Sequence, residues 1–343
     1  MATGETNELR MKDLSNYSLK GHNTFGIEAC CRRFLEYESV EEAVEIARIL
    51  RQEKAPYIII GGGSNLLLTK DFEGIVVHSA MKGCEFEDCL MVCGSGETFD
   101  DVVQLSLEKG LYGMENLSLI PGDVGASAVQ NIGAYGAEAK DVIEWVESVS
   151  IPTGEVCTFS DEDCCYGYRD SRFKRDWKNL YLITHVAYRL SSDFKPRLDY
   201  GNIRAELERQ GLTSPDALQL RQTIIDIRNA KLPDPKVTGN AGSFFMNPVV
   251  GREKYEELAA SYENMPHYTI DADHEKIPAG WLIDQCGWKG KSLGRAGVHP
   301  KQALVLVNLG GATGQEIVDL CRAIQQDVQQ KFGIEIKPEV NII

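Results

Sequence analysis

The chain has 343 residues, and its 51 acidic against 36 basic side chains give a formal net charge of −15. Apolar residues make up 43% and charged residues 25%, which excludes a disordered or collagen-like chain. The acidic balance argues against a general nucleic-acid-binding protein, which needs a basic face. No apolar run approaches the length of a membrane span, and the first residues lack the apolar core of a secretion signal. We therefore expect a cytoplasmic protein without membrane contact.

The ten cysteines and six histidines show neither Cys-x-x-Cys nor His-x-x-x-His spacing. Without a secretion signal, cysteines are by default reduced thiols. We therefore expect no metal site.

Segments with helical and with strand periodicity are mixed along the chain, which predicts an α and β protein. A helix is predicted over 39–50, where Ser39 and Glu42 have capping-box spacing and apolar residues share one face. Residues 57–60 form a short apolar run that predicts a buried strand. Further strands are predicted at 74–77 and 90–93, followed by a helix that Thr98 and Asp101 cap in the same way.

The second half of the chain continues this mixture, with longer strands predicted at 142–151 and 180–190. A helix is predicted from Pro215 to Asn229, and two prolines soon after it indicate a hinge. A last helix is predicted over 313–332, again with a capping box. The alternation at 333–343 predicts a terminal strand with Glu339 on its solvated face. We place domain boundaries near 72 and 230, which gives domains 1–72, 73–230 and 231–343.

Two glycine-rich segments are candidate anion-binding turns. Three glycines, Ser64 and Asn65 directly follow the strand at 57–60, and consecutive glycines let backbone N–H groups converge on an anion. The spacing fits neither a P-loop nor the dinucleotide-binding fingerprint, so this segment alone favours a tight turn. The second segment, 119–136, holds four glycines within 15 residues. Two such turns would suit the diphosphate of a dinucleotide cofactor, but crossing backbones in a crowded turn explain the glycines equally well.

Two other segments carry candidate chemistry. In 239–248, Gly242 leaves Ser243 open to a ligand, and a serine so placed can donate a proton. No GxSxG pattern or suitably spaced histidine supports a nucleophilic serine, and a serine bonded within its own turn is the commoner case. In 164–174, aromatic rings alternate with cations, so Arg169 could bind a carboxylate or phosphate strongly. The alternative is a surface turn at Arg169 and Asp170.

Together these motifs resemble the UDP-N-acetylenolpyruvoylglucosamine reductases, flavoenzymes of bacterial cell-wall precursor synthesis. The resemblance extends from residue 23 to residue 340. It rests on the segments GGGSNLLL, IPGDVGASAVQNIGAYG, YGYRDSRFK, KLPDPKVTGNAGSFFMNP, AGWLIDQCGWKG and HPKQALVLVN. The YGYRDS segment and the loop at 200–201 are similar to the longer of the two subtypes in the family. One departure is Asn341, where members often carry a basic residue.

The resemblance implies a three-domain α+β fold. Its first two domains would form a vanillyl-alcohol-oxidase-like (PCMH-type) FAD-binding unit, and its third would bind the substrate, with the C-terminal strand returning to the active site. FAD would be bound non-covalently and NADPH would be the co-substrate. The reaction would convert UDP-N-acetylglucosamine enolpyruvate to UDP-N-acetylmuramate, with hydride passing from flavin N5 to C3 of the substrate and a proton from Ser243 to C2. The enzyme would act as a monomer.

Carried over motif by motif, the resemblance also assigns residues. Catalysis would rest on Ser243, with Arg169 and Glu339 polarising the carboxylate and stabilising the enolate. The positions that match FAD contacts are Gly61, Gly62, Gly63, Ser64, Asn65, Pro121, Gly122, Gly125, Ala126, Ser127, Gln130, Asn131, Gly133, Tyr135 and Arg228. Those that match substrate contacts are Tyr168, Tyr200, Lys231, Asn247, Lys289 and Gln302. Two alternatives remain, namely an FAD-dependent oxidoreductase of the same fold with another substrate, and a nucleotide-binding module without activity.

Overall fold

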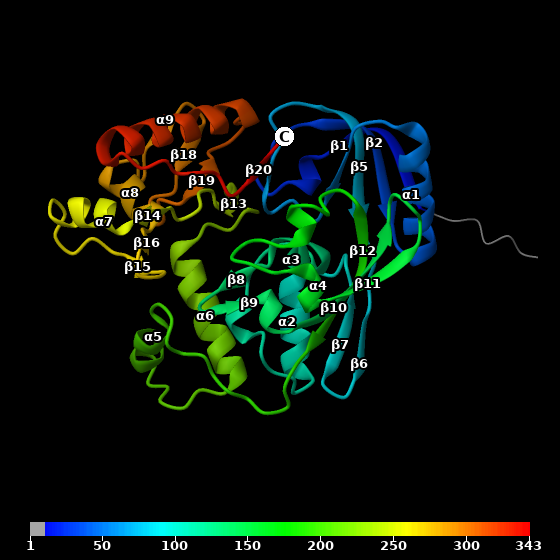
Figure 1. Cartoon of the computed structure of the whole chain (residues 1–343), viewed down its shortest axis with the longest axis horizontal. Helices are drawn as coiled ribbons and strands as arrows, with labels where there is room; N and C mark the ends of the chain where they lie inside the picture. The colour runs from blue at the N-terminus through cyan, green and yellow to red at the C-terminus, as the bar shows by residue number, and fades with distance from the viewer. Residues whose placement is uncertain (1–10) are drawn as a thin grey trace, which may run out of the picture. The chain divides into compact units, whose positions relative to one another are not determined.

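The computed structural model of the chain describes residues 11–343, which divide into two compact units (Figure 1). Unit 1 contains the described part of Met1–Tyr17, Cys31–Gly62 and Glu73–Arg228, and unit 2 contains Ser18–Cys30, Gly63–Phe72 and Asn229–Ile343. Both are built from segments far apart in the sequence. Helices and mainly antiparallel sheets make up both units, and the predicted α+β fold is confirmed. The division into three domains at 72 and 230 stays a prediction.

The first sheet of unit 1 carries the turn that begins at Gly61. Its strand order is β1-β2-β5-β3, and the parallel pair β3 and β5 places Ile60 opposite His78. Helix α1 starts where predicted, with the Ser39 hydroxyl accepting the Glu42 N–H at 3.2 Å, and buries its apolar face against this sheet. The elements are β1 (Lys12–Ser18), β2 (Cys30–Tyr37), α1 (Val40–Glu53), β3 (Tyr57–Ile60) and β5 (Phe72–Ser79).

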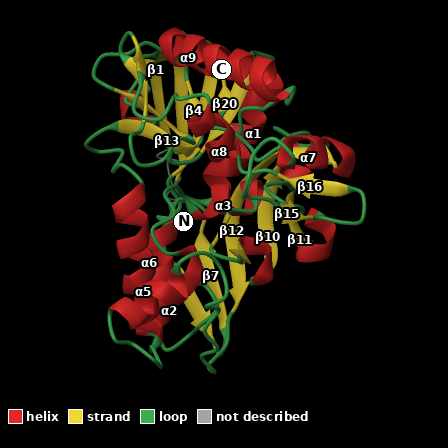
Figure 2. Ribbon diagram, turned by 90° about the vertical axis from the view of Figure 1, so that its left-hand side faces the viewer, coloured by secondary structure: helices red, strands yellow, loops and turns green. Residues whose placement is uncertain are grey.

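The second sheet of unit 1 has the order β11-β10-β12-β7-β6 and is antiparallel throughout. Helix α3 packs against β12, and its apolar residues share one core with α2 and this sheet (Figure 2). The elements are β6 (Cys84–Glu87), β7 (Leu90–Gly94), α2 (Phe99–Glu108), α3 (Val124–Gln130), β8 (Gly133–Ala134), β9 (Ala137–Glu138), β10 (Ile143–Ser150), β11 (Val156–Ser160), α4 (Asp161–Cys164), β12 (Tyr181–Arg189), α5 (Ile203–Arg209) and α6 (Ala217–Lys231).

Unit 2 is built on a sheet of order β13-β19-β18-β17 with α9 packed on it. Helix α9 has the predicted capping box of Thr313 and Glu316 and ends at Gly333, whose φ is 66°. The elements are β4 (Leu66–Leu67), β13 (Gly239–Ser243), β14 (Val249–Gly251), α7 (Arg252–Ala259), β15 (Tyr268–Thr269), β16 (His274–Lys276), α8 (Ala279–Gln285), β17 (Ser292–Leu293), β18 (Ala296–Val298), β19 (Val305–Asn308), α9 (Gly314–Phe332) and β20 (Asn341–Ile342). Short 3₁₀ helices are η1 (Lys20–His22), η2 (Glu115–Leu117), η3 (Ala139–Asp141) and η4 (Arg172–Lys174).

Three predicted details are wrong. Helix α2 starts after Thr98, but the Thr98 side chain makes no capping hydrogen bond. Helix α6 begins at Ala217, two residues later than predicted, and runs on to Lys231. The predicted terminal strand is reduced to β20 and an isolated bridge at Pro338.

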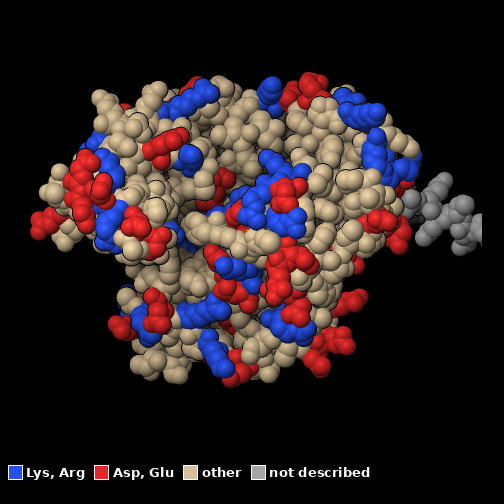
Figure 3. All heavy atoms as spheres, viewed as in Figure 1, with Lys and Arg blue, Asp and Glu red and all other residues tan. Residues whose placement is uncertain are grey.

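The described surface carries charges of both signs. Figure 3 shows Lys and Arg side chains interspersed with Asp and Glu side chains over the face that it presents. Within residues 11–343, no helix is long and apolar enough to cross a bilayer.

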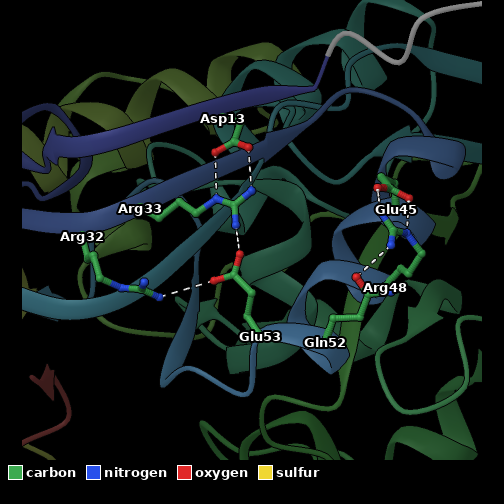
Figure 4. A network of polar contacts seen from close by, with 7 residues as sticks. All are labelled: Asp13, Arg32, Arg33, Glu45, Arg48, Gln52 and Glu53. Atoms are coloured by element: carbon green, nitrogen blue, oxygen red, sulfur yellow. Dashed lines mark hydrogen bonds and ion pairs between the residues drawn. The ribbon is translucent and has the colours of Figure 1, made fainter.

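One network of surface ion pairs ties together three elements of unit 1. Arg33 on β2 reaches Asp13 on β1 through two hydrogen bonds of 2.6 and 2.8 Å and also binds Glu53 at the end of α1 (Figure 4). Arg32 lies 3.5 Å from the same Glu53 carboxylate. Arg48, by contrast, pairs only along its own helix with Glu45 and Gln52.

We expect Arg33→Met to lower the unfolding free energy by about 1 kcal/mol at low salt, since a network of partly exposed pairs has this order of effect. The loss should shrink in high salt, where exposed charges are screened. Urea unfolding of the apoprotein at two salt concentrations measures both effects. Arg48→Met is the matched control and should leave the midpoint almost unchanged. An equal shift for both variants would contradict a role of Arg33 in linking the three elements.

Candidate functional site

In unit 1, the glycine turn after β3 packs directly against the turn that opens α3. A Cβ atom added to Gly61 would lie 2.9 Å from the Cβ of Ala126, and one added to Gly62 would lie 3.0 Å from Oδ1 of Asp123. The absence of side chains therefore lets the two turns approach each other. This close approach is compatible with both interpretations of the sequence, a turn where two backbones cross and a turn that binds an anion.

The α3 turn is held in place from behind. Backbone N–H groups of Val124 and Gly125 donate to the carbonyls of Glu97 and Ser95, each at 2.9 Å. The buried Ser127 hydroxyl donates to the Val124 carbonyl at 2.6 Å and lies 3.1 Å from the Tyr188 hydroxyl. The side chain of Ser127 thus points into the core, so any contact of this residue with a cofactor would come from its backbone.

Asn131, at the other end of α3, holds the chain through its side-chain hydrogen bonds. Its side-chain amide donates to the Gly167 carbonyl at 2.7 Å and to the Glu138 carboxylate at 3.2 Å, and its side-chain oxygen accepts the Lys140 N–H at 3.0 Å. The residue is buried and has a φ of 46°, which ends α3. Asn131 therefore fixes the path of the chain between α3 and Gly133.

Arg169 lies at a tight turn and reaches back to the second glycine segment. Its guanidinium donates to the Gly133 carbonyl and lies 5.3 Å from the Tyr168 ring. Asp170 pairs with Arg175 instead. Arg169 and Asp170 thus share a tight turn, as the alternative interpretation predicted, but the Arg169 guanidinium reaches the second glycine segment.

Arg228 is a second cation in the same region of unit 1. Burial lowers the pKa of Arg228 and the charge of Arg169 lowers it further, while Tyr135 and Asp100 act in the opposite direction. Its Nε atom is buried and has no hydrogen-bond partner among the described residues. A buried guanidinium N–H without a partner, close to a second guanidinium, is the arrangement expected of an anion site.

Two predicted substrate residues, Tyr168 and Tyr200, are half exposed. Tyr200 lies against the end of the second glycine segment, where a Cβ atom on Gly136 would be 3.2 Å from the Tyr200 Cβ. Of the other predicted cofactor residues, Pro121 is exposed, Gly122 is partly buried before α3, and Gln130 is partly buried as the last residue of α3.

In unit 2, Gly63 and Asn65 join segments that are distant in the sequence. Gly63 has a φ of 67°, and its carbonyl accepts the Thr24 N–H at 3.2 Å. Asn65 donates from its side chain to the Glu339 carbonyl at 3.3 Å, and its own carbonyl accepts the Asn341 N–H at 3.1 Å. The residue that departs from the family pattern, Asn341, thus contacts the predicted FAD turn. Ser64 lies partly buried between Gly63 and Asn65.

Ser243 is the last residue of β13 and follows a break in its register. The pairing with β19 shifts between Asn240 and Ser243, and Gly242 within this bulge has a φ of 66°. Such a bulge re-aims the side chain that follows it. The Ser243 side chain is exposed, and no hydrogen bond to its hydroxyl is found among the described residues. The interpretation of Ser243 as a serine bonded within its own turn is therefore wrong.

Glu339 is hydrogen-bonded to the residue that follows this serine. Its N–H donates to the Phe244 carbonyl at 2.8 Å, and the neighbouring residues Phe245 and Pro338 form a bridge. Glu339 is partly buried, whereas Glu335 and Lys337 at the preceding alternate positions are exposed. Unit 2 thus brings Ser243, Glu339 and Asn65 together.

The predicted substrate residues of unit 2 lie in two groups. Asn247 accepts the Ala279 N–H at 2.9 Å, and the Gln302 side-chain oxygen is 3.2 Å from where a Cβ on Gly280 would lie, so both reach the start of α8. Lys231 is exposed at the end of α6, and Lys289 is exposed and 3.2 Å from Asp284.

One polar group beside the glycine turns was not predicted. His78 on β5 lies between two carboxylates, with Nδ1 at 2.8 Å from Glu36 and Nε2 at 3.5 Å from Asp123. No local pattern could have revealed this group, because its members come from β2, β5 and the α3 turn.

The residues present fit a bound FAD. The glycines at 61, 62 and 122 keep side chains off two partly buried turns, and Nε of Arg228 has no hydrogen-bond partner among the described residues. Among residues 11–343, no group of three or more His, Cys, Asp or Glu side chains is placed to hold a metal ion.

Comparisons with known proteins agree with this description. Residues 32–160 match the family profile of an FAD-binding domain, and residues 234–343 match that of the UDP-N-acetylenolpyruvoylglucosamine reductase C-terminal domain. The fold and site thus define a flavoprotein oxidoreductase with FAD as its cofactor.

Relatives and a solved structure define the family. The chain is 53% identical over 332 residues to UDP-N-acetylenolpyruvoylglucosamine reductase from Bacteroides fragilis (strain YCH46). These residues cover 95% of this chain and 99% of that protein. The chain is 45% identical over 339 residues to the reductase of the same name from Flavobacterium johnsoniae, with 97% and 100% covered. The chain belongs to the UDP-N-acetylenolpyruvoylglucosamine reductase family. The crystal structure of the Thermus caldophilus reductase shares its fold, with a TM-score of 0.67 at 23% identity and 97% and 98% covered.

Proposed function

We propose that this protein reduces UDP-N-acetylglucosamine enolpyruvate to UDP-N-acetylmuramate, with NADPH as the reductant, in peptidoglycan precursor synthesis. Identity of 53% over nearly the full length of a reductase of that name supports the substrate. The observation that carries the proposal is the Ser243 hydroxyl, which is exposed at the end of β13 and has no hydrogen bond among the described residues; the next residue, Phe244, accepts the Glu339 N–H. An oxidoreductase that only moved hydride would need no such proton donor.

FAD, once bound, would supply the hydride chemistry between NADPH and the enolpyruvyl group. The chain itself supplies the proton and the binding groups. Ser243 would donate its hydroxyl proton to C2, which completes the lactyl ether. The bulge at Gly242 fixes the direction of this hydroxyl.

Arg169 would bind the substrate carboxylate, on which negative charge grows as the enolate forms. Its contact with the Gly133 carbonyl holds the guanidinium in place. Glu339 would support the same enolate. A carboxyl group stabilises an enolate only when it donates a hydrogen bond, so this role requires Glu339 to be protonated at that step.

FAD would be bound by the glycine turns and Arg228. The nucleotide sugar and NADPH would be bound by Asn247 and Gln302 near α8 and by Tyr168, Tyr200, Lys231 and Lys289. Lysine and arginine side chains would provide local positive charge for these anions in an acidic chain. The proposal includes a monomer in the cytoplasm, and light scattering during size-exclusion chromatography tests the oligomeric state.

The decisive experiment follows NADPH oxidation by the purified protein with and without the enolpyruvyl nucleotide sugar. We expect oxidation only with this substrate, and a product heavier by two hydrogen atoms in mass spectrometry. UDP-N-acetylglucosamine, which lacks the enolpyruvyl group, is the matched control. A flavin that NADPH reduces but this substrate does not reoxidise would favour another oxidoreductase. A colourless protein that cannot be reconstituted with FAD would favour an inactive nucleotide-binding module.

A further inference from the structure

We propose that His78 is the counter-ion that allows the carboxylate of Asp123 to lie in the FAD diphosphate turn, so that FAD affinity depends on the charge of His78. The inference rests on FAD lying at the turns of Gly61 and Gly122. It does not depend on which substrate the bound flavin reduces.

The starting observation is an acidic residue inside a candidate anion cradle. The Asp123 carboxylate approaches both glycines of the first turn, with Oδ1 3.0 Å from the position of a Cβ on Gly62 and Oδ2 3.4 Å from that on Gly61. Asp123 occupies the N-cap position of α3, but its side chain makes no capping hydrogen bond. Capping therefore does not explain the carboxylate, and a diphosphate at these turns would be repelled by it unless its charge is neutralised.

His78 supplies the opposite charge. It lies on β5 opposite Ile60, the residue that precedes Gly61. Its Nε2 atom is 3.5 Å from the Asp123 carboxylate, and its Nδ1 atom is 2.8 Å from Glu36. A neutral imidazole has one N–H and one acceptor nitrogen, whereas both nitrogens of His78 face carboxylates. Two facing carboxylates therefore favour the doubly protonated, cationic ring.

The charges around His78 form a neutral row when this ring is protonated. Lys12 on β1 lies 3.2 Å from Glu36 on β2, so two cations alternate with the two carboxylates. Among the described residues, Ile60 on β3 lies opposite His78, and the centroid of the Phe34 ring is 6.2 Å from that of His78. Burial lowers the pKa of His78, but the contacts with Asp123 and Glu36 outweigh it, and the pKa is raised overall.

Loss of this proton leaves an unbalanced negative charge next to the turn. Since the pKa of His78 is raised, the cation is complete below the ordinary histidine range and is lost as the pH rises through the shifted value. The diphosphate stays fully ionised throughout. FAD should therefore bind tightly while His78 is protonated and more weakly as the pH rises through its pKa.

The test measures FAD affinity of the apoprotein by quenching of flavin fluorescence between about pH 6 and about pH 9, the range in which a histidine with a raised pKa titrates. We expect the Kd to rise with pH in the wild type. His78→Gln should raise the Kd about tenfold at the acidic end and abolish the pH dependence, since it removes one partner of a charge pair. His185→Gln is the matched control, because His185 also pairs with a carboxylate on a strand of unit 1, that of Glu147 at 2.9 Å.

A double variant separates charge neutralisation from simple structural support. If His78 acts by neutralising Asp123, Asp123→Asn should restore FAD binding in the His78→Gln background to within about threefold of the wild type. Failure of the double variant to bind better than His78→Gln alone would overturn the proposal, and so would an unchanged Kd in His78→Gln. Circular dichroism checks that each apoprotein is folded.

If His78→Gln does not fold, the single variant Asp123→Asn still tests the proposal. This variant should bind FAD at least as tightly as the wild type at the alkaline end and show a flatter pH profile. Weaker binding at every pH would overturn the proposal. All these titrations use FAD alone, so they remain valid even if the enolpyruvyl nucleotide sugar proves not to be the substrate.

Discussion

Replacing Ser243 with alanine should leave the reduction of FAD by NADPH unchanged but slow the turnover of the enolpyruvyl substrate about a thousandfold, the scale of a lost general acid. The hydroxyl is exposed and has no hydrogen bond among the described residues, so its removal takes nothing from the fold. The backbone of β13, with its bulge at Gly242, stays as it is. The two half-reactions should therefore respond very differently.

Stopped-flow spectroscopy of the flavin measures each half-reaction separately. The first trace follows bleaching by NADPH, and the second follows reoxidation by the enolpyruvyl nucleotide sugar. Ser261→Ala, at another exposed serine of unit 2, is the control and should leave both rates unchanged. Equal slowing of both half-reactions by Ser243→Ala would show that the residue positions FAD or the ligands and does not donate the proton.

Local sequence patterns predicted the helices whose first residues form capping hydrogen bonds. Helix α9 has the capping box that Thr313 and Glu316 predict, and α1 starts at the predicted Ser39. The short helix α3 was not predicted, because a single run of seven small and mixed residues after a glycine turn has no clear apolar face. Tertiary contacts fix it, above all the backbone bonds to Ser95 and Glu97.

The terminal segment shows where periodicity is misleading. Alternate side chains do point inward, since Ile334 and Ile336 are buried as expected. The backbone nevertheless forms only the bridge at Pro338 and the two residues of β20, and other backbone groups use other partners. The Ile336 carbonyl, for example, accepts a hydrogen bond from the Gln325 side chain. Burial and strand pairing are separate properties, and the sequence pattern reports only the first.

The candidate site could be predicted in its parts but not in its assembly. Each of the motifs around Asn65, Ser243 and Glu339 is visible in the sequence, yet Asn65 and Glu339 are 274 residues apart. Nothing local encodes that contact. The same holds for His78 and Asp123, which come together only because β5 and the α3 turn meet. Resemblance also assigned Ser127 and Asn131 to the cofactor, whereas their side chains bind other parts of the chain.

Gly63→Ala should lower the unfolding free energy by about 3 kcal/mol or more, since it combines backbone strain with a clash. Gly63 has a φ of 67°, a conformation that alanine adopts only at a cost. A Cβ atom here would also lie 2.0 Å from the His22 carbonyl oxygen, which is backbone and cannot rotate away. Urea unfolding of the apoprotein measures the loss without a contribution from bound FAD.

Gly26→Ala separates the two causes, because Gly26 has a nearly equal φ of 64° but nothing within 4 Å of an added Cβ. This control should lose only the left-handed backbone cost, about 1 kcal/mol. The further loss in Gly63→Ala would come from pushing Gly63 away from the segment at 22–24, where its carbonyl now accepts the Thr24 N–H. Asn65 would move with it, and so would its hydrogen bond to Glu339. Equal destabilisation by the two variants would mean that the close approach of Gly63 to His22 does not hold this turn in place.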